Sequence, residues 1–291
     1  MAILSIQSHV VFGYAGNTAA VFPIQRLGRE VWAINTVEFS NHTGYGSWRG
    51  KVLGAELAEE LVIGLEERGV LNRCEAVLSG YLGDAEAGKA IIDAVKKVKN
   101  ESPKALYCCD PVMGDVGRGF YVKPDIPDMF KKELVPLADI VCPNQFELEA
   151  LTGIDTSKIE NAVKAINIIH KMGPSIVLVT SFKEKEQSSP ELSMIASDKK
   201  NIFKVTTVEL PLGNGVAGTG DMTTAVFLSR YLETGDLEKT LRLCTESIFG
   251  VLEASFKAAS SQEGTSPMEL KIIDAQQELV APSNSFKAEK L

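Results

Sequence analysis

The chain has 291 residues, of which 45% are hydrophobic and 23% are charged, a composition typical of a globular protein. Its net charge of -8 argues against a general polyanion binder, because such proteins need a basic surface to neutralise phosphates. Five cysteines without zinc-type spacing and only three histidines disfavour a zinc site, so we expect buried, reduced thiols in a cytoplasmic protein.

Short apolar runs alternate with amphipathic helical patterns along the chain. The run 2–6 predicts a first strand rather than a signal peptide, followed by a helix over 17–28 and a strand over 31–37. The elements expected next are, in chain order, helix 55–69, strand 75–80, helix 85–100, strand 105–111, helix 128–137, strand 139–144, helices 145–153 and 160–173, strand 175–181, strands 191–197 and 201–210, and helix 222–233.

Helices between apolar strands indicate a mainly parallel sheet covered by helices on both faces. Strands 191–197 and 201–210 have no helix between them, so we expect an antiparallel hairpin at one edge. We expect a single domain over residues 1–291, and no apolar stretch is long enough to cross a bilayer.

Ligands of such sheets bind beyond the carboxyl ends of the strands. The positions that we expect there are Ser8, Asn41 to Tyr45, Tyr81, Asp110, Asn144 and Thr180.

The segment GVAGTGD, residues 215–221, precedes the expected helix 222–233. Gly218 and Gly220 allow successive backbone amides to face one anion, and the helix dipole favours the same charge. A carboxylate at Asp221 would be repelled by a bound phosphate, but it could accept a proton from an attacking hydroxyl. An ordinary turn with an Asp N-cap explains the segment equally well.

Two further motifs carry carboxylates. In CCDPVMGD, Asp110 and Asp115 suit contacts with a cation or a ligand hydroxyl, although turn-forming aspartates are the simpler explanation. In PNQFELEAL, Asn144 and Glu147 are three residues apart at a helix start and suit hydrated Mg²⁺ with a triphosphate. A helix-capping pair is an equal alternative.

The segments SIQSHVVFGYAGN and VEFSNHTGYGSW are rich in small hydroxyl, amide and aromatic side chains. Ser8 follows the first expected strand, and Thr43 and Tyr45 lie in an expected non-helical loop. Such side chains suit a flat aromatic substrate with polar edges, although surface-loop aromatics would look the same.

Together these motifs, with LSGYLGD, ADIVCPNQFELEALTG and VLVTS, resemble the pyridoxal kinases of the ribokinase-like superfamily, in order and spacing, from Ala2 to about Ala259. The resemblance implies a ribokinase-like α/β/α fold with three layers, ATP-dependent phosphorylation of the 5′-hydroxymethyl group of pyridoxal, pyridoxine and pyridoxamine, Mg²⁺, an activating monovalent cation such as K⁺, and a homodimer.

The resemblance also implies roles for individual residues. Asp221 resembles the catalytic base, and the amides of Gly218, Thr219 and Gly220 resemble its anion hole. The implied substrate positions are Ser8, Thr43 and Tyr81. The implied positions for ATP and cations are Asp110, Asp115, Tyr121, Cys142, Asn144, Glu147, Thr180, Ser181 and Thr219, with Leu212, Gly213 and Asn214 in the adenosine loop and Asp110, Glu147 and Thr180 at metal.

Two departures from the family pattern affect these expectations. Cys142 stands where animal-type members have a threonine, and the loop DVGRGFY is shorter than theirs, with Phe120 where some bacterial members have cysteine. Two alternative functions stay open: a hydroxymethylpyrimidine kinase on the same scaffold, and a non-catalytic pyridoxal phosphate-binding protein.

Overall fold

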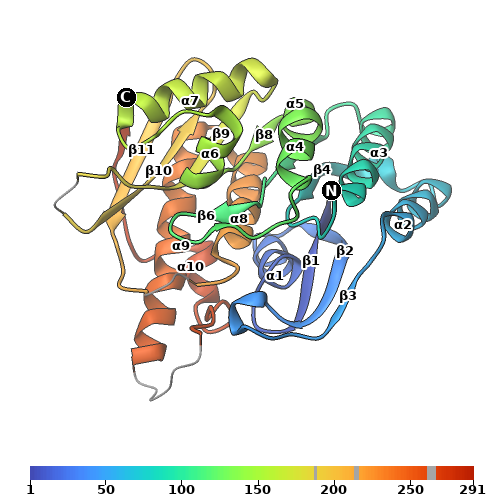
Figure 1. Ribbon diagram of the computed structural model, residues 1–291, viewed down its shortest axis with the longest axis horizontal. Coiled ribbons are helices and arrows are strands. Elements are labelled where there is room, and N and C mark those ends of the chain that lie inside the picture. Colours follow the sequence, from blue (N-terminus) through green and yellow to red (C-terminus); the bar gives the residue numbers. More distant parts are fainter. Residues whose placement is uncertain (187–188, 213–215, 261–266) are drawn as a thin grey trace.

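The computed structural model describes residues 1–186, 189–212, 216–260 and 267–291 (Figure 1). Strands of the large sheet are β1 (Ala2–Phe12), β2 (Glu30–Asn41), β3 (Gly50–Val52), β4 (Cys74–Ser79), β5 (Leu106–Cys109), β8 (Ile140–Val141), β9 (Ile176–Phe182), β10 (Glu191–Ser197), β11 (Ile202–Val208) and β12 (Ala288–Lys290). A separate hairpin consists of β6 (Gly114–Asp115) and β7 (Gly119–Phe120).

Within the described ranges, the large sheet has ten strands in the order β12-β11-β10-β9-β8-β5-β4-β1-β2-β3. The six strands from β9 through β2 are parallel to one another. Strands β10, β11 and β12 extend one edge in antiparallel fashion, and β3 does so at the other edge. The expected parallel sheet with an antiparallel hairpin is confirmed.

The helices are α1 (Asn17–Arg26), α2 (Ala55–Glu67), α3 (Ala85–Glu101), α4 (Ile126–Met129), α5 (Val135–Leu137), α6 (Gln145–Thr152), α7 (Ile159–Met172), α8 (Thr219–Thr234), α9 (Leu237–Ser260) and α10 (Gln276–Val280). The helix expected over 128–137 is formed by α4, a π-helical turn and α5.

Alternating side chains of the strands divide the core into two clusters, one on each face of the sheet. Leu4 of β1 and Val177 of β9 pack with α2, α3, α6 and α7, whereas Ile3 and Leu178 pack with α1, α8, α9 and α10. The protein therefore has three layers, and the central strands are apolar on both faces because helices cover both.

Several boundaries differ from the sequence-based expectations. Strand β1 continues to Phe12 because its last residues pair with β2, so Ser8 lies inside the strand, at a register shift between Gln7 and His9, rather than after it. Thr43–Tyr45 forms one 3-10 turn and not a non-helical loop. Elements α9, α10, β3, β12 and the β6–β7 hairpin were not predicted.

All five cysteines are buried free thiols, as expected. In the part of the chain that the structure describes, no helix combines the length and the apolarity needed to span a bilayer.

Candidate active site

The GTGD segment forms the start of α8. Gly218 occupies the N-cap position with a left-handed backbone (φ 81°), and Asp221 is the third residue of the helix. Asp221 is therefore not the N-cap, and that simpler explanation is wrong. No side chain caps this helix start, although the Thr219 amide donates to the Val216 carbonyl at 3.4 Å, and a first helical turn of this kind can bind an anion.

The turn between β1 and α1 packs against this helix start. A Cβ atom on Gly218 would lie 2.4 Å from the Tyr14 carbonyl oxygen, and one on Gly16 would lie 2.3 Å from Ser8 Oγ. Burial raises the pKa of Asp221, while backbone amide hydrogen bonds, first that of Gly16, lower it in part. Gly16 thus lies next to both Ser8 and Asp221, and sequence reasoning missed it because its role depends on the tertiary fold.

Carboxylates gather beside α8 at the carboxyl end of β5. Asp110 is buried, and its Oδ2 accepts a hydrogen bond from Thr224 Oγ1 of α8 at 3.0 Å. Burial, followed by the charge of Asp221, raises the pKa of Asp110 well above its usual value. Burial, followed by the charge of Asp110, does the same for the pKa of Glu147. These groups are close enough to repel one another as anions.

Asn144 and Glu147 form a reciprocal capping box at the start of α6. Asn144 Oδ1 accepts from the Glu147 amide, and Glu147 Oε2 accepts from the Asn144 amide, each at 2.9 Å. Glu147 Oε1 also accepts from the Met113 amide at 2.9 Å, and Asn144 Nδ2 donates to the Gly114 carbonyl at 2.8 Å. The capping interpretation is confirmed, and the same contacts fix the Asp110–Asp115 loop beside α6.

The β6–β7 hairpin lies over this acidic group. Phe120 packs edge-on against Phe146 of α6 with ring centroids 4.9 Å apart. The Tyr121 amide donates to the Met113 carbonyl at 3.1 Å. Desolvation, then the charges of Glu147 and Asp115, raises the pKa of Tyr121, although 39% of this residue is exposed.

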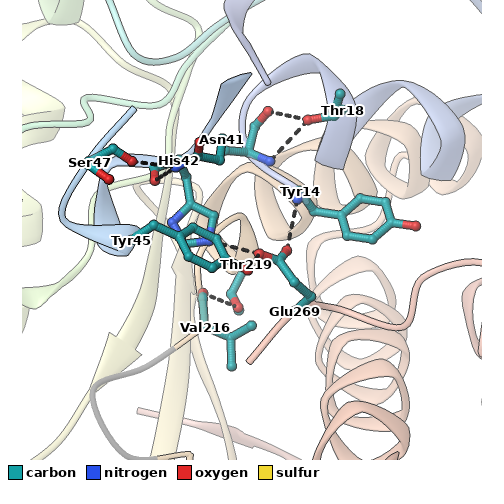
Figure 2. Close-up of polar contacts among 10 residues, drawn as sticks. Tyr14, Thr18, Asn41, His42, Tyr45, Ser47, Val216, Thr219 and Glu269 are labelled. Atoms are coloured by element: carbon teal, nitrogen blue, oxygen red, sulfur yellow. Dashed lines mark hydrogen bonds and ion pairs between the residues drawn. The ribbon is translucent and has the colours of Figure 1, made fainter. Parts of the chain in front are cut away.

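The expected substrate positions surround the carboxyl ends of β1, β2 and β4. Thr43 lies in the exposed 3-10 turn after β2. The carbonyl of Tyr81, just after β4, accepts a hydrogen bond from Thr36 Oγ1 of β2 at 2.8 Å. His42, just before the turn, and Tyr45, its last residue, both contact Glu269, a distant residue that no local pattern singled out (Figure 2).

The remaining expected nucleotide positions lie in different surroundings. Thr180 and Ser181 are half-buried in β9, and the Thr180 amide donates to the Pro143 carbonyl at 3.1 Å. Cys142 is buried in the core cluster with α8, so its side chain is closed to solvent. Leu212 is half-buried, and Gly213 and Asn214 lie outside the described residues.

Among the described residues, no three His, Cys, Asp or Glu side chains form a ready-made metal site. The side chains of Asp110 and Glu147 nevertheless offer only oxygen donors, and neighbouring negative charges help to raise the pKa of each. Such a site fits a hard cation that keeps water molecules and phosphate oxygens as its other ligands. A helix start open to an anion, a carboxylate in its first turn and a nearby acidic group are typical of phosphoryl-transfer enzymes.

Comparison with known proteins identifies the family. Residues 65–269 match a family model described as phosphomethylpyrimidine kinase. The chain is 47% identical to pyridoxal kinase PdxY of Rubrobacter xylanophilus and 45% identical to that of Granulibacter bethesdensis. These alignments cover 99% of this chain in both cases, and 97% and 99% of the respective relatives.

Among solved structures, the chain is similar to the pyridoxal kinase from Leishmania donovani in complex with ADP and pyridoxamine. The TM-score is 0.92 at 28% sequence identity, and the match covers 100% of this chain and 99% of the other. The protein is an enzyme of the kinase class with a ribokinase-like fold. It belongs to the pyridoxal kinase family.

Proposed function

We propose that this protein transfers the γ-phosphoryl group of ATP to the 5′-hydroxymethyl group of pyridoxal, and of pyridoxine and pyridoxamine, for vitamin B6 salvage. The observation that carries the proposal is the Asp221 carboxylate in the first turn of α8, at a helix start that no side chain caps. The named relatives and the ADP complex of a similar kinase support the substrate and ATP.

Asp221 is the proposed base. Its raised pKa makes it a better proton acceptor than an ordinary aspartate, while the amide of Gly16 helps to hold the carboxylate in place. As the substrate hydroxyl attacks the γ-phosphorus, the bond between this phosphorus and the bridging oxygen of the β-phosphate breaks, ADP leaves, and Asp221 accepts the hydroxyl proton. The amides of Gly218, Thr219 and Gly220 offset the charge on the transferred phosphoryl oxygens, and each such donor contributes about 3 kcal/mol.

Substrate and nucleotide are assigned to opposite sides of α8. Ser8, Thr43 and Tyr81 are the proposed substrate positions, on the side of β1, β2 and β4, and Ser8 and Thr43 are the proposed contacts of the pyridine ring. Nucleotide positions are proposed at Asp110, Asp115, Tyr121, Cys142, Asn144, Glu147, Thr180 and Ser181, on the side of β5, β8 and β9, and at Thr219 in α8 itself. From the family resemblance, an adenosine loop is also proposed at Leu212 to Asn214, of which Gly213 and Asn214 lie outside the described residues.

Mg²⁺ is proposed at Asp110, Glu147 and Thr180, and it would neutralise charge on the ATP phosphates. Both oxygens of Glu147 already accept backbone amides, so Glu147 would act through water or a remaining lone pair. A monovalent cation such as K⁺ is proposed from the family resemblance.

Asp110→Asn is expected to stabilise the ligand-free protein at neutral pH. The pKa of Asp110 is higher in the folded state than in the unfolded state. The contribution of Asp110 to stability is therefore fully present below the unfolded-state pKa, and it is lost as the pH rises through the folded-state pKa. Calorimetric unfolding with and without Mg²⁺·ATP measures this, and the ligand-induced stabilisation should shrink in the variant. A less stable variant with an undiminished ligand response would contradict the assignment.

The proposed function is tested by ATP- and Mg²⁺-dependent formation of pyridoxal 5′-phosphate from pyridoxal. A parallel assay with hydroxymethylpyrimidine addresses the other kinase on this scaffold. Preferential phosphorylation of hydroxymethylpyrimidine would replace the proposal, and pyridoxal phosphate binding without ATP turnover would support the non-catalytic alternative.

We also propose a cytoplasmic homodimer of a single 291-residue kinase domain. Apolar side chains on the β1–β2–β3 ribbon support a protein interface: Val11 and Phe12 are 79% and 59% exposed, and Trp48 and Val52 are 46% and 40% exposed. Sedimentation should give twice the mass of the chain, and Phe12→Glu should shift it toward the monomer. A monomeric wild-type protein at assay concentration would refute the dimer.

A further inference from the structure

Glu269 joins three segments that are far apart in the sequence (Figure 2). It lies between α9 and α10. Its Oε1 accepts from Tyr45 Oη at 2.8 Å and pairs with His42 Nε2 at 2.9 Å, while Oε2 accepts from the Tyr14 amide at 3.1 Å. The side chain of Glu269 is only 17% exposed, so these contacts are largely shielded from water.

The geometry of these contacts requires a carboxylate. Donors approach both oxygens, so an amide side chain would place its NH₂ group against one of the donors. Space is also restricted, because a Cβ atom on Gly13 would lie 2.5 Å from Glu269 Oε2. Burial by itself would raise the pKa of Glu269, but hydrogen bonds, chiefly those from His42 and Tyr45, hold this pKa below its usual value.

Both ends of this contact set lead to the proposed active site. His42 and Tyr45 flank Thr43 in the 3-10 turn, so Glu269 fixes the turn that carries a proposed pyridoxal contact. The Tyr14 amide donates to Glu269, and the Tyr14 carbonyl oxygen would lie 2.4 Å from a Cβ atom on Gly218 at the start of α8. One carboxylate therefore ties the Thr43 turn to the wall of the GTGD segment.

We propose that Glu269 is a positioning residue for the pyridoxal subsite: it holds the Thr43 turn and the β1–α1 turn at a fixed separation without touching the reacting atoms. The inference rests on the proposed function. Because the contacts lie on the β1–β2 side of α8, away from the β5–β8–β9 side assigned to ATP, the loss of Glu269 should affect pyridoxal more than ATP.

The test compares Glu269→Gln with Glu253→Gln, which removes the same charge from the surface of α9, where Glu253 pairs with Lys257. We expect Glu269→Gln to raise KM for pyridoxal about tenfold, from the loss of charged hydrogen bonds, with KM for ATP changed less than about twofold. Glu253→Gln should change neither. Circular dichroism and thermal unfolding establish that each variant is folded.

Tyr45→Phe provides a second measurement if Glu269→Gln does not fold, because it removes one hydroxyl from the same contact set. It should raise KM for pyridoxal selectively, and its effect should be non-additive with that of Glu269→Gln. Equal effects on both substrates, or no effect on pyridoxal, would overturn the positioning role. A wild-type protein that does not phosphorylate pyridoxal would instead refute the proposed function.

Discussion

Replacing Asp221 by asparagine is expected to lower kcat by about three orders of magnitude while the fold stays intact. The asparagine has the same shape, and its carbonyl oxygen can still accept a hydrogen bond from the Gly16 amide, but it cannot take the proton of the substrate hydroxyl. Steady-state kinetics with pyridoxal and ATP measure the loss, and KM for ATP should change little.

A second aspartate at a helix start provides the matched control. Asp236 accepts the amide of Lys239 at the start of α9, and Asp236→Asn should retain activity and stability because asparagine caps helices equally well. If folded Asp221→Asn keeps near-normal turnover, Asp221 is not the base.

The pH dependence of the wild-type enzyme gives an independent measure of the same residue. Asp221 must be deprotonated to act, and burial raises its pKa above 3.8. Activity should therefore fall as pH decreases through that raised value, and the residual activity of Asp221→Asn should lack this acid limb. If Asp221→Asn keeps the acid limb of the wild-type enzyme, a group other than Asp221 is responsible for that titration.

Replacing Gly218 by alanine is expected to reduce both stability and activity. The backbone has φ +81°, and a Cβ atom would lie 2.4 Å from the Tyr14 carbonyl oxygen. The left-handed conformation alone costs about 1–2 kcal/mol for a residue with a side chain, and relief of the clash must displace the β1–α1 turn. We expect a lower denaturation midpoint and kcat/KM reduced at least about tenfold, because a displaced turn misplaces the Gly16 amide at Asp221.

Gly220, two residues further on, serves as the control for backbone strain. It is inside α8, and a Cβ atom added there would have no heavy atom of another part of the chain within 4 Å. Gly220→Ala should keep or raise stability by about 0.5–1 kcal/mol, since alanine favours helix more than glycine. If Gly220→Ala loses activity but not stability, phosphate approaches the backbone at Gly220. If Gly218→Ala and Gly220→Ala are equally stable, the argument from backbone strain at Gly218 is wrong.

Most of the layered core was predictable because its signal is local. Apolar strands such as 175–181 and amphipathic helices such as α3 and α7 show their periodicity within single segments. Short or polar elements had no such signal: β12 is the three-residue segment Ala288–Lys290, and it is a strand because it pairs with β11. The end of β1 likewise depends on pairing with β2, which is why Ser8 lies within the strand.

The candidate site also combines features that are local in the sequence with contacts that form only in the folded protein. The glycines, Thr219 and Asp221 are adjacent in the chain, so the sequence by itself indicated a helix start with a carboxylate in its first turn, while an Asp N-cap stayed equally open. For Asn144 and Glu147, whose spacing lies within one helical turn, the sequence offered a capping pair and a Mg²⁺ site as equal alternatives, and the structure shows the capping pair. Only the tertiary structure decided that Gly16 lies at Asp221, that Thr224 contacts Asp110, and that Glu269 joins the Tyr14 and Thr43 turns. The residues of each contact are far apart in the sequence, and no local periodicity encodes a contact that forms only when the layers pack.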